Sequence, residues 1–257
     1  MAGLELQFVG SGDAFGSGGR FNTCIMASCG GSRFLVDCGA SSLVALRSEG
    51  IDPNQLGLVL ITHLHGDHFG GLPFLLMDAK HLSHRRQPLI LAGPPGLETR
   101  LRETREALFP GSTTAAPAFP LHIREIVPGA PLAMEITPAR GIPPETVSVE
   151  AFAVDHPSGA PAYAYHIQAG GRSFAYSGDT GWCPGLVDAA RGAHLLITEC
   201  CSYARELKHH LNYQTLQAHR AELETPRIIL THMNPDMLEH SIRLPDEFAR
   251  DGLVVQV

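Results

Sequence analysis

One short stretch, the THLHGDH of residues 62–68, constrains this 257-residue chain more than any other. It directly follows an apolar run, Leu58–Ile61, which is typical of a buried strand. Alternation along an extended segment places His63 and His65 on one side, and a turn after them would direct Asp67 and His68 to a second centre. A metal ion needs only three or four protein ligands. Four from this loop, with more elsewhere, therefore predict two metal ions.

A chance run of polar residues after a strand is the competing interpretation. That interpretation would be preferred for a single histidine, but not for four metal-competent side chains that directly follow an apolar strand. The composition is that of a globular protein, with 44% hydrophobic and 18% charged residues. A formal net charge of −7 gives no overall attraction to nucleic acid or to an anionic membrane surface. A local basic patch is still compatible with this charge.

Compartment and membrane signals are weak in this chain. The N-terminus alternates apolar and polar residues, as a strand does, and carries no secretory signal. No apolar run is long enough to span a membrane. The six cysteines form neither a CxxC pair nor a disulfide-scaffold spacing, which favours free thiols. We therefore expect a cytoplasmic protein with no membrane partner; a homodimer stays open.

Two halves of similar style follow one another along the chain. We expect one domain over residues 1–257, with a seam near 111–148, where proline and alanine are frequent. The fold class is α/β: two mixed β-sheets packed face to face with helices outside, an αββα sandwich. Strands are predicted at residues 4–9, 23–27, 33–36, 58–61, 88–92, 147–154, 162–168, 173–177, 195–198, 227–231 and 253–257. Helices are predicted at residues 41–49, 73–83, 97–108, 184–190 and 215–222.

The segment THLHGDHFGG, placed after its apolar strand, resembles the signature of the metallo-β-lactamase superfamily. The opening FVGSGD at residues 8–13, with Phe15, Gly16 and Asn22-Thr23, resembles the first loop of its ribonuclease Z-like branch. FLVDCG at residues 34–39 resembles the second element of the superfamily. The resemblance implies that Asp37 supports the metal ligands by orienting a histidine; an ordinary turn residue is the alternative.

The resemblance also implies a ligand set for two divalent ions. The first would be bound by His63, His65 and His156, and the second by Asp67, His68 and His232. A bridging carboxylate would come from Asp179, because its two oxygens can each take one ion. His166 competes with His156 for its place. Histidine and carboxylate ligands without thiolate suit zinc, and manganese or iron stay open.

Two residues outside the ligand set point to phosphodiester chemistry. Glu199 matches a glutamate of the ribonuclease Z family, although Thr198 stands where that family has histidine. His210, ahead of a predicted helix, matches a later histidine that the glutamate orients near the scissile phosphate. His209 is its register alternative, and both could be exposed residues before a helix. Asp67, besides binding metal, is expected to orient the attacking hydroxide.

One departure bears on the substrate. Short-form ribonuclease Z carries a long arm for transfer RNA between the segments that match His156 and Asp179, which are only 23 positions apart here. That spacing favours an arm-less phosphodiesterase acting on small or cyclic phosphodiesters over a transfer-RNA endonuclease. A lactonase, a thioester hydrolase, a relative of the coenzyme PQQ biosynthesis protein B and a non-catalytic metal-stabilised binding protein stay as alternatives, because fold does not fix substrate.

Overall fold

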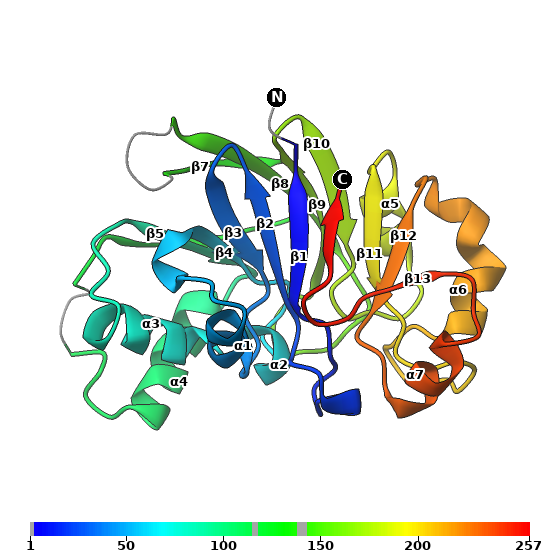
Figure 1. The fold of residues 1–257 in the computed structure, drawn as a ribbon, viewed down its shortest axis with the longest axis horizontal. Coiled ribbons are helices and arrows are strands. Elements are labelled where there is room, and N and C mark those ends of the chain that lie inside the picture. The colour runs from blue at the N-terminus through cyan, green and yellow to red at the C-terminus, as the bar shows by residue number, and fades with distance from the viewer. Residues whose placement is uncertain (1–2, 115–117, 138–142) are drawn as a thin grey trace.

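The computed structural model describes residues 3–114, 118–137 and 143–257, which form two facing β-sheets with helices on both outer sides (Figure 1). The first sheet has the order β14-β1-β2-β3-β4-β5-β6. Its strands are β1 (Glu5–Gly10), β2 (Cys24–Cys29), β3 (Ser32–Val36), β4 (Leu56–Leu60), β5 (Leu89–Gly93), β6 (Leu121–Glu125) and β14 (Val254–Gln256). The predicted αββα sandwich is confirmed.

The second sheet has the order β13-β12-β11-β10-β9-β8-β7. Its strands are β7 (Leu132–Ile136), β8 (Glu145–Ala153), β9 (Tyr163–Ala169), β10 (Arg172–Tyr176), β11 (Leu195–Glu199), β12 (Ile228–Thr231) and β13 (Glu247–Phe248). Both sheets are mixed in the same way, with antiparallel hairpins leading into parallel strands. The chain changes sheets between Glu125 and Leu132, within residues 111–148.

The core lies in three layers that follow the strand alternation. In β3, Phe34 and Val36 pack between the sheets, while Leu35 packs outward under the helices. The helices α1 (Ser42–Ser48), α3 (Leu72–His81) and α4 (Leu97–Leu108) cover the first sheet. The second sheet is covered by α5 (Pro184–Ala190), α6 (Tyr213–His219) and α7 (Pro235–Ser241). With both faces covered, β4 and β11 are buried throughout.

Several element predictions were wrong in detail. The sequence of Met233–Met237, just after His232, predicts a loop that could touch substrate. Instead, Pro235 begins α7, and the Asn234 side chain caps this helix by accepting from the Met237 N–H. Asparagine followed by proline is a helix-start signal that the prediction overlooked. The α6 helix begins at Tyr213 instead of 215 and continues as a 3-10 turn, Arg220–Leu223. The strands β6 and β7 lie within residues 111–148, where the sequence indicates only short strand-like pieces without definite bounds. The two-residue strand β13 was not predicted, because it is too short to show a pattern.

Arg85 holds the connection between α3 and β5 in place. Its guanidinium, 3% exposed, donates to the carbonyls of Gln87, Pro53, Leu56 and Pro88 and lies over the Phe119 ring, 5.5 Å from its centre. Burial lowers the pKa of Arg85 to about 10. The side chain therefore satisfies carbonyls that would otherwise be buried without a donor.

We expect Arg85→Met to lower the free energy of unfolding by about 3 kcal/mol, because several buried carbonyls lose their donor. Urea unfolding measures the effect. The exposed neighbour gives the matched control, Arg86→Met, for which the change should stay within about 0.5 kcal/mol. Equal stabilities for the two variants would contradict this account of Arg85.

None of the described helices is both long and apolar enough to cross a membrane.

Candidate metal centre and active site

The candidate site lies at the edge where several strands of both sheets end. The loop after β4 carries His63 to His68, and the loops after β8, β10 and β12 carry His156, Asp179 and His232. Strands β8 and β10 are both antiparallel to β9 and so run in the same direction. Their carboxyl ends therefore meet at one edge, as ligand-bearing loops of α/β folds do.

Close backbone contacts hold the histidine loop against the loop after β3. The Cys38 N–H donates to the His68 carbonyl at 2.7 Å, and the Gly71 N–H donates to the Cys38 carbonyl at 2.8 Å. A side chain on Gly39 would lie 2.1 Å from the Asp67 carbonyl oxygen. Glycine is thus required here for the two loops to touch. The short helix α2 (Gly66–Phe69) then turns Asp67 and His68 inward.

Six histidine and aspartate residues form two groups of three, and a seventh residue, Asp179, lies between the two groups. The first group contains His63, His65 and His156, whose ligand atoms lie within 4.8 Å of one another. Asp179 Oδ2 lies 3.9 Å from both His63 Nε2 and His156 Nε2.

The second group surrounds the other oxygen of the same carboxylate. Asp179 Oδ1 lies 3.1 Å from His68 Nε2 and 3.4 Å from His232 Nε2. Asp67 Oδ2 lies 3.2 Å from each of these two nitrogens. One oxygen of Asp179 therefore faces each group, which is the arrangement that a bridging ligand needs.

The arrangement fits metal ions better than it fits hydrogen bonds. Among the described residues, the buried atoms His63 Nε2, Asp179 Oδ1 and His232 Nδ1 have no hydrogen-bond partner. Ring nitrogens also face each other: His65 Nδ1 and His156 Nε2 are 3.0 Å apart, and His68 Nε2 and His232 Nε2 are 3.4 Å apart. Buried polar atoms without partners are costly. Cations placed between these lone pairs would satisfy them.

For His63, Asp67 and Asp179 the surroundings favour the protonation states that metal ligands need. His68 and His232 differ: burial lowers the pKa of each ring, but Asp179 and Asp67 outweigh it and raise that pKa well above its usual value, so both rings must lose a proton to bind a metal ion. Burial lowers the pKa of His63 well below its usual value, which keeps its ring neutral. Burial alone would raise the pKa of Asp67, but His68 and His232 outweigh it and hold that pKa well below the usual range. The same two histidines hold the pKa of Asp179 low against its burial. The carboxylates are therefore ionised.

Asp37 supports the histidines from behind. Its carboxylate, fully buried, accepts from His68 Nδ1 at 2.6 Å and from the Thr62 N–H at 2.8 Å. The Thr62 hydroxyl contacts both Asp37 and His63 Nδ1. The hydrogen bond from His68 Nδ1 to Asp37 directs Nε2 of His68 to Asp67 and Asp179, as carboxylate partners of ligating histidines do.

We expect Asp37→Asn to weaken metal binding about 10- to 100-fold, because the partner of His68 Nδ1 loses its charge. Competition with a chelator at known free metal concentration measures the effect. Asp52→Asn, an exposed aspartate at the start of a 3-10 turn, is the control and should bind metal as the parent does. Parental affinity in Asp37→Asn would remove Asp37 from this role.

Backbone strain gathers around the site. Five described residues other than glycine have positive φ, and three of them border the site: Asp37 at 61°, His209 at 62° and His232 at 57°. The His209 carbonyl accepts from His156 Nδ1 at 3.1 Å, so this strained residue orients His156. Such conformations persist where the surrounding structure enforces them, and they cluster at functional sites.

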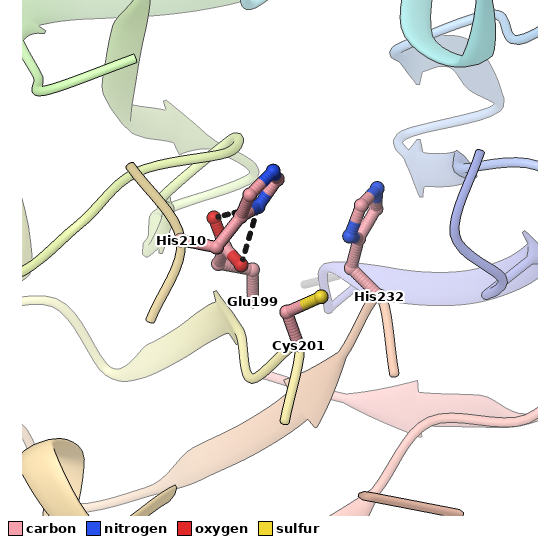
Figure 2. A group of neighbouring side chains, drawn as sticks. All are labelled: Glu199, Cys201, His210 and His232. Atoms are coloured by element: carbon pink, nitrogen blue, oxygen red, sulfur yellow. Dashed lines mark hydrogen bonds and ion pairs between the residues drawn. The ribbon is translucent and has the colours of Figure 1, made fainter. Parts of the chain in front are cut away.

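The structure distinguishes His210 from its neighbour. His210 Nδ1 lies 3.1 Å from Glu199 Oε2 (Figure 2). The centre of the His210 ring lies 5.0 Å from that of the His156 ring. Glu199 is fully buried, and burial raises the pKa of its carboxyl against the lowering effect of His210. The His209 ring instead pairs with Asp155 at 3.0 Å. His166, on β9, does not join the cluster: its Nδ1 lies 3.0 Å from the carbonyl oxygen of Ala189 on α5.

A cavity of about 590 Å³ opens over the two groups. Besides His65, Asp67, His156, Asp179, His210 and His232, it is lined by residues that the sequence pattern did not single out as site residues: Asp13, Ala14, Phe15, Ser17, Cys201, Leu207, Lys208, Asn234 and Pro235. The Cys201 sulfur points toward His232 (Figure 2). No sequence signal marked Cys201, since a free cysteine after a strand, like its neighbour Cys200, is usually a core residue.

Phe69 and Trp182 both follow ligand-bearing loops, so the sequence allows either the mouth of the site or the core for each of them. Phe69 is 3% exposed and packs in the core under the helices of the first sheet. Trp182 stacks on His219 at 4.7 Å and lines a neighbouring cavity of about 400 Å³, which also touches His210.

Comparisons with known proteins agree with this geometry. A family model described as anti-Pycsar protein Apyc1 matches residues 4–254. The ribonuclease Z of Mycolicibacterium gilvum is 28% identical over 205 residues, covering 76% of this chain and 68% of that protein. The zinc phosphodiesterase ELAC protein 1 of Mus musculus is 35% identical over 130 residues, covering 49% of this chain and 34% of that protein.

Solved structures resemble the whole chain. Human tRNase Z, short form, superposes with a TM-score of 0.73 at 23% identity and covers 98% of each chain. A diphosphatase from the PhnP family superposes with a TM-score of 0.74 at 19% identity, covering 99% of this chain and 98% of that one. The metallo-β-lactamase fold protein YhfI from Bacillus subtilis reaches 0.72 at 21% identity over all of both chains. At these identities the likeness shows a shared fold.

Proposed function

The chain belongs to the anti-Pycsar protein Apyc1 family, and on this premise we propose that it hydrolyses small or cyclic phosphodiesters. It is a metal-dependent hydrolase of the metallo-β-lactamase fold, related to ribonuclease Z. The observation that carries the proposal is the pairing of buried Glu199 with His210 beside the two ligand groups. A proton donor next to an ionised cluster suits a reaction in which an alkoxide leaves phosphorus.

We propose that His63, His65 and His156 bind one divalent ion and that Asp67, His68 and His232 bind the other, with Asp179 between them. The split of the Asp179 oxygens between the groups supports this assignment. Zinc suits the nitrogen and oxygen donors, and manganese or iron would also accept them. When bound, such ions lower the pKa of water and neutralise charge on the phosphoryl oxygens.

The residues of the chain divide the remaining work. Asp67, whose side chain is 10% exposed at the cavity floor, accepts a hydrogen bond from the attacking water and so orients it. As oxygen attacks phosphorus and the P–O bond to the leaving group breaks, His210 gives its ring proton to the departing oxygen. Glu199 accepts from Nδ1 of His210, which leaves Nε2 to make the transfer. The attacking water releases one proton to the solvent, and His210 regains one from the solvent, so the protons balance over the cycle.

The site contains features that argue against a long transfer-RNA arm at the expected position. Between His156 and Asp179 the chain forms the hairpin of β9 and β10, joined only by Gly170 and Gly171.

Carbonyl chemistry on the same residues, by a lactonase or thioester hydrolase, is the second candidate, because the metal cluster serves both reactions.

The deciding experiment compares bis(p-nitrophenyl) phosphate, a lactone and a thioester, using protein whose metal content is counted. We expect about two metal ions per chain and preferential turnover of the phosphodiester. Turnover of carbonyl substrates alone would move the function to the lactonase or thioesterase class. A metal-loaded protein inert toward every substrate would favour a binding role, and cleavage of a precursor transfer RNA would restore the endonuclease interpretation.

A further inference from the structure

A further group of possible metal ligands surrounds His210, beside the two groups described above. One ligand atom from each of four residues lies within 4.8 Å of the other three: Glu199, Cys201, His210 and His232 (Figure 2). Of these, only His232 belongs to the two groups described above. The other three offer a carboxylate, a sulfur and an imidazole, which are the three kinds of side-chain ligand that zinc takes. Sulfur sets this group apart, because the other two groups contain only nitrogen and oxygen donors.

The fold holds these three side chains in place. Glu199 ends β11 and Cys201 follows two residues later, while His210 lies just before α6. The Cys201 N–H donates to the Leu211 carbonyl at 2.8 Å, which fixes the His210 loop beside the end of β11. The Glu199 carboxylate, fully buried, accepts from the Thr180 N–H. The three donors are therefore already assembled, which lowers the cost of binding a ligand.

The spacing of the donors suits an ion as well as it suits a hydrogen bond. His210 Nδ1 lies 3.2 Å and 3.1 Å from the two oxygens of Glu199. Two ligands of one tetrahedral zinc ion are roughly 3.3 Å apart, because each bond to zinc is about 2.0–2.1 Å long. An ion can therefore replace the proton between His210 and Glu199 without a large movement of either side chain.

His232 gives an independent indication of a ligand beside the sulfur. It is 2% exposed, and its Nδ1 has no hydrogen-bond partner among the described residues. Its Nε2 faces Asp67 and Asp179, so Nδ1 is the ring nitrogen turned away from them, and the Cys201 sulfur points toward this ring (Figure 2). When Nε2 binds an ion, the ring proton stays on Nδ1 and needs an acceptor. A metal-bound thiolate is a good acceptor, whereas a neutral thiol is a weak one.

An ion can reach this group from solvent and be neutralised there. Cys201 and His210 both line the cavity of about 590 Å³ that opens over the site. The carboxylate of Glu199 and a thiolate of Cys201 carry two negative charges, which balance one divalent ion. On binding, the thiol proton of Cys201 and the Nδ1 proton of His210 leave to water. Sulfur favours soft ions such as cadmium and also accepts zinc.

We propose that Glu199, Cys201 and His210 form a third cation site, which takes a thiophilic divalent ion and thereby inhibits the enzyme. The inhibition rests on the proposed function, because the ion binds the ring that donates the proton. With its Nδ1 proton displaced, the His210 ring carries a single proton, on Nε2, and is a much weaker acid than the imidazolium. The first two ions keep their own ligands when the third ion binds.

The test adds cadmium to protein loaded with zinc and follows the ultraviolet charge-transfer absorption of a cadmium–thiolate bond. Because the first two groups contain no sulfur, only a cysteine outside them can produce this band. We expect a band that saturates at about one cadmium ion per chain in the parent and is lost in Cys201→Ser. His210→Gln should shift the band to higher cadmium concentration. Cys183→Ser is the control, because loss of this half-buried cysteine should leave the band unchanged.

The outcomes separate the inference from the function it rests on. Absence of the band in the parent would overturn the inference, as would a band that survives in Cys201→Ser or stays unshifted in His210→Gln. The rate for an alkyl phosphodiester is measured with and without cadmium on each protein. We expect cadmium to slow the parent about 10²-fold or more, as loss of a general acid does, and to leave Cys201→Ser at its own starting rate. The band with undiminished turnover would uphold the cation site and reject His210 as the proton donor.

Discussion

Replacing Asp67 by alanine is expected to remove the second metal ion and to reduce phosphodiester turnover by about 10³-fold or more. Asp67 Oδ2 lies 3.2 Å from both His68 Nε2 and His232 Nε2, so the variant removes one of the two carboxylates that these buried rings share. Charge stabilisation by a bound ion is worth several kcal/mol in the transition state, which corresponds to a loss of this size. Metal counting and kcat/KM for bis(p-nitrophenyl) phosphate, measured on the same sample, check the prediction.

The control for Asp67→Ala is Asp188→Ala. Asp188 is an aspartate on α5 whose side chain is 46% exposed and which pairs only with Arg191 on the surface. Its loss should change the free energy of unfolding by less than about 1 kcal/mol and leave metal content unchanged. Full metal content with undiminished turnover in Asp67→Ala would reject the assignment of Asp67 to both roles.

The second large effect is expected for His210→Ala, and it should depend on the leaving group. A general acid contributes about 10²- to 10⁴-fold when the departing oxygen needs a proton. An alkyl phosphodiester has such a leaving group, whereas p-nitrophenolate departs as a stable anion. We therefore expect a large loss in kcat for an alkyl diester, a much smaller loss for bis(p-nitrophenyl) phosphate, and unchanged metal content. Equal losses for both substrates would show that His210 does not donate the proton.

His209→Ala is the matched control for this experiment. The His209 ring pairs with Asp155, and the carbonyl that orients His156 belongs to the backbone and survives the substitution. His209 already has a positive φ, a conformation that costs about 1–3 kcal/mol for residues other than glycine. Alanine therefore keeps a backbone strain that the parent protein already carries. A leaving-group dependence that follows His209 instead of His210 would reverse the assignment.

Some of the site could be predicted from the sequence because its signals are local. The histidine loop follows an apolar strand within a few residues, and strand alternation predicted most strands of the two sheets. The layered α/β class followed from strand-rich halves that each carry helices. The bounds of β6, β7 and β13 could not be predicted, because each is a short strand at the edge of a sheet that pairs with a single neighbour.

What the sequence by itself determined was the supply of ligand-type residues and their order along the chain: a loop of histidines and aspartate, then isolated residues after later strands. Only the tertiary structure decided which of these side chains meet. It placed the His210 ring, and not the His209 ring, beside Glu199, because the chain turns here and His209 has a positive φ, so the two rings point to different partners. It also brought Phe15 to a cavity whose other walls lie near residues 207 and 235. Contacts across such separations depend on the packing of two sheets, which no local pattern encodes.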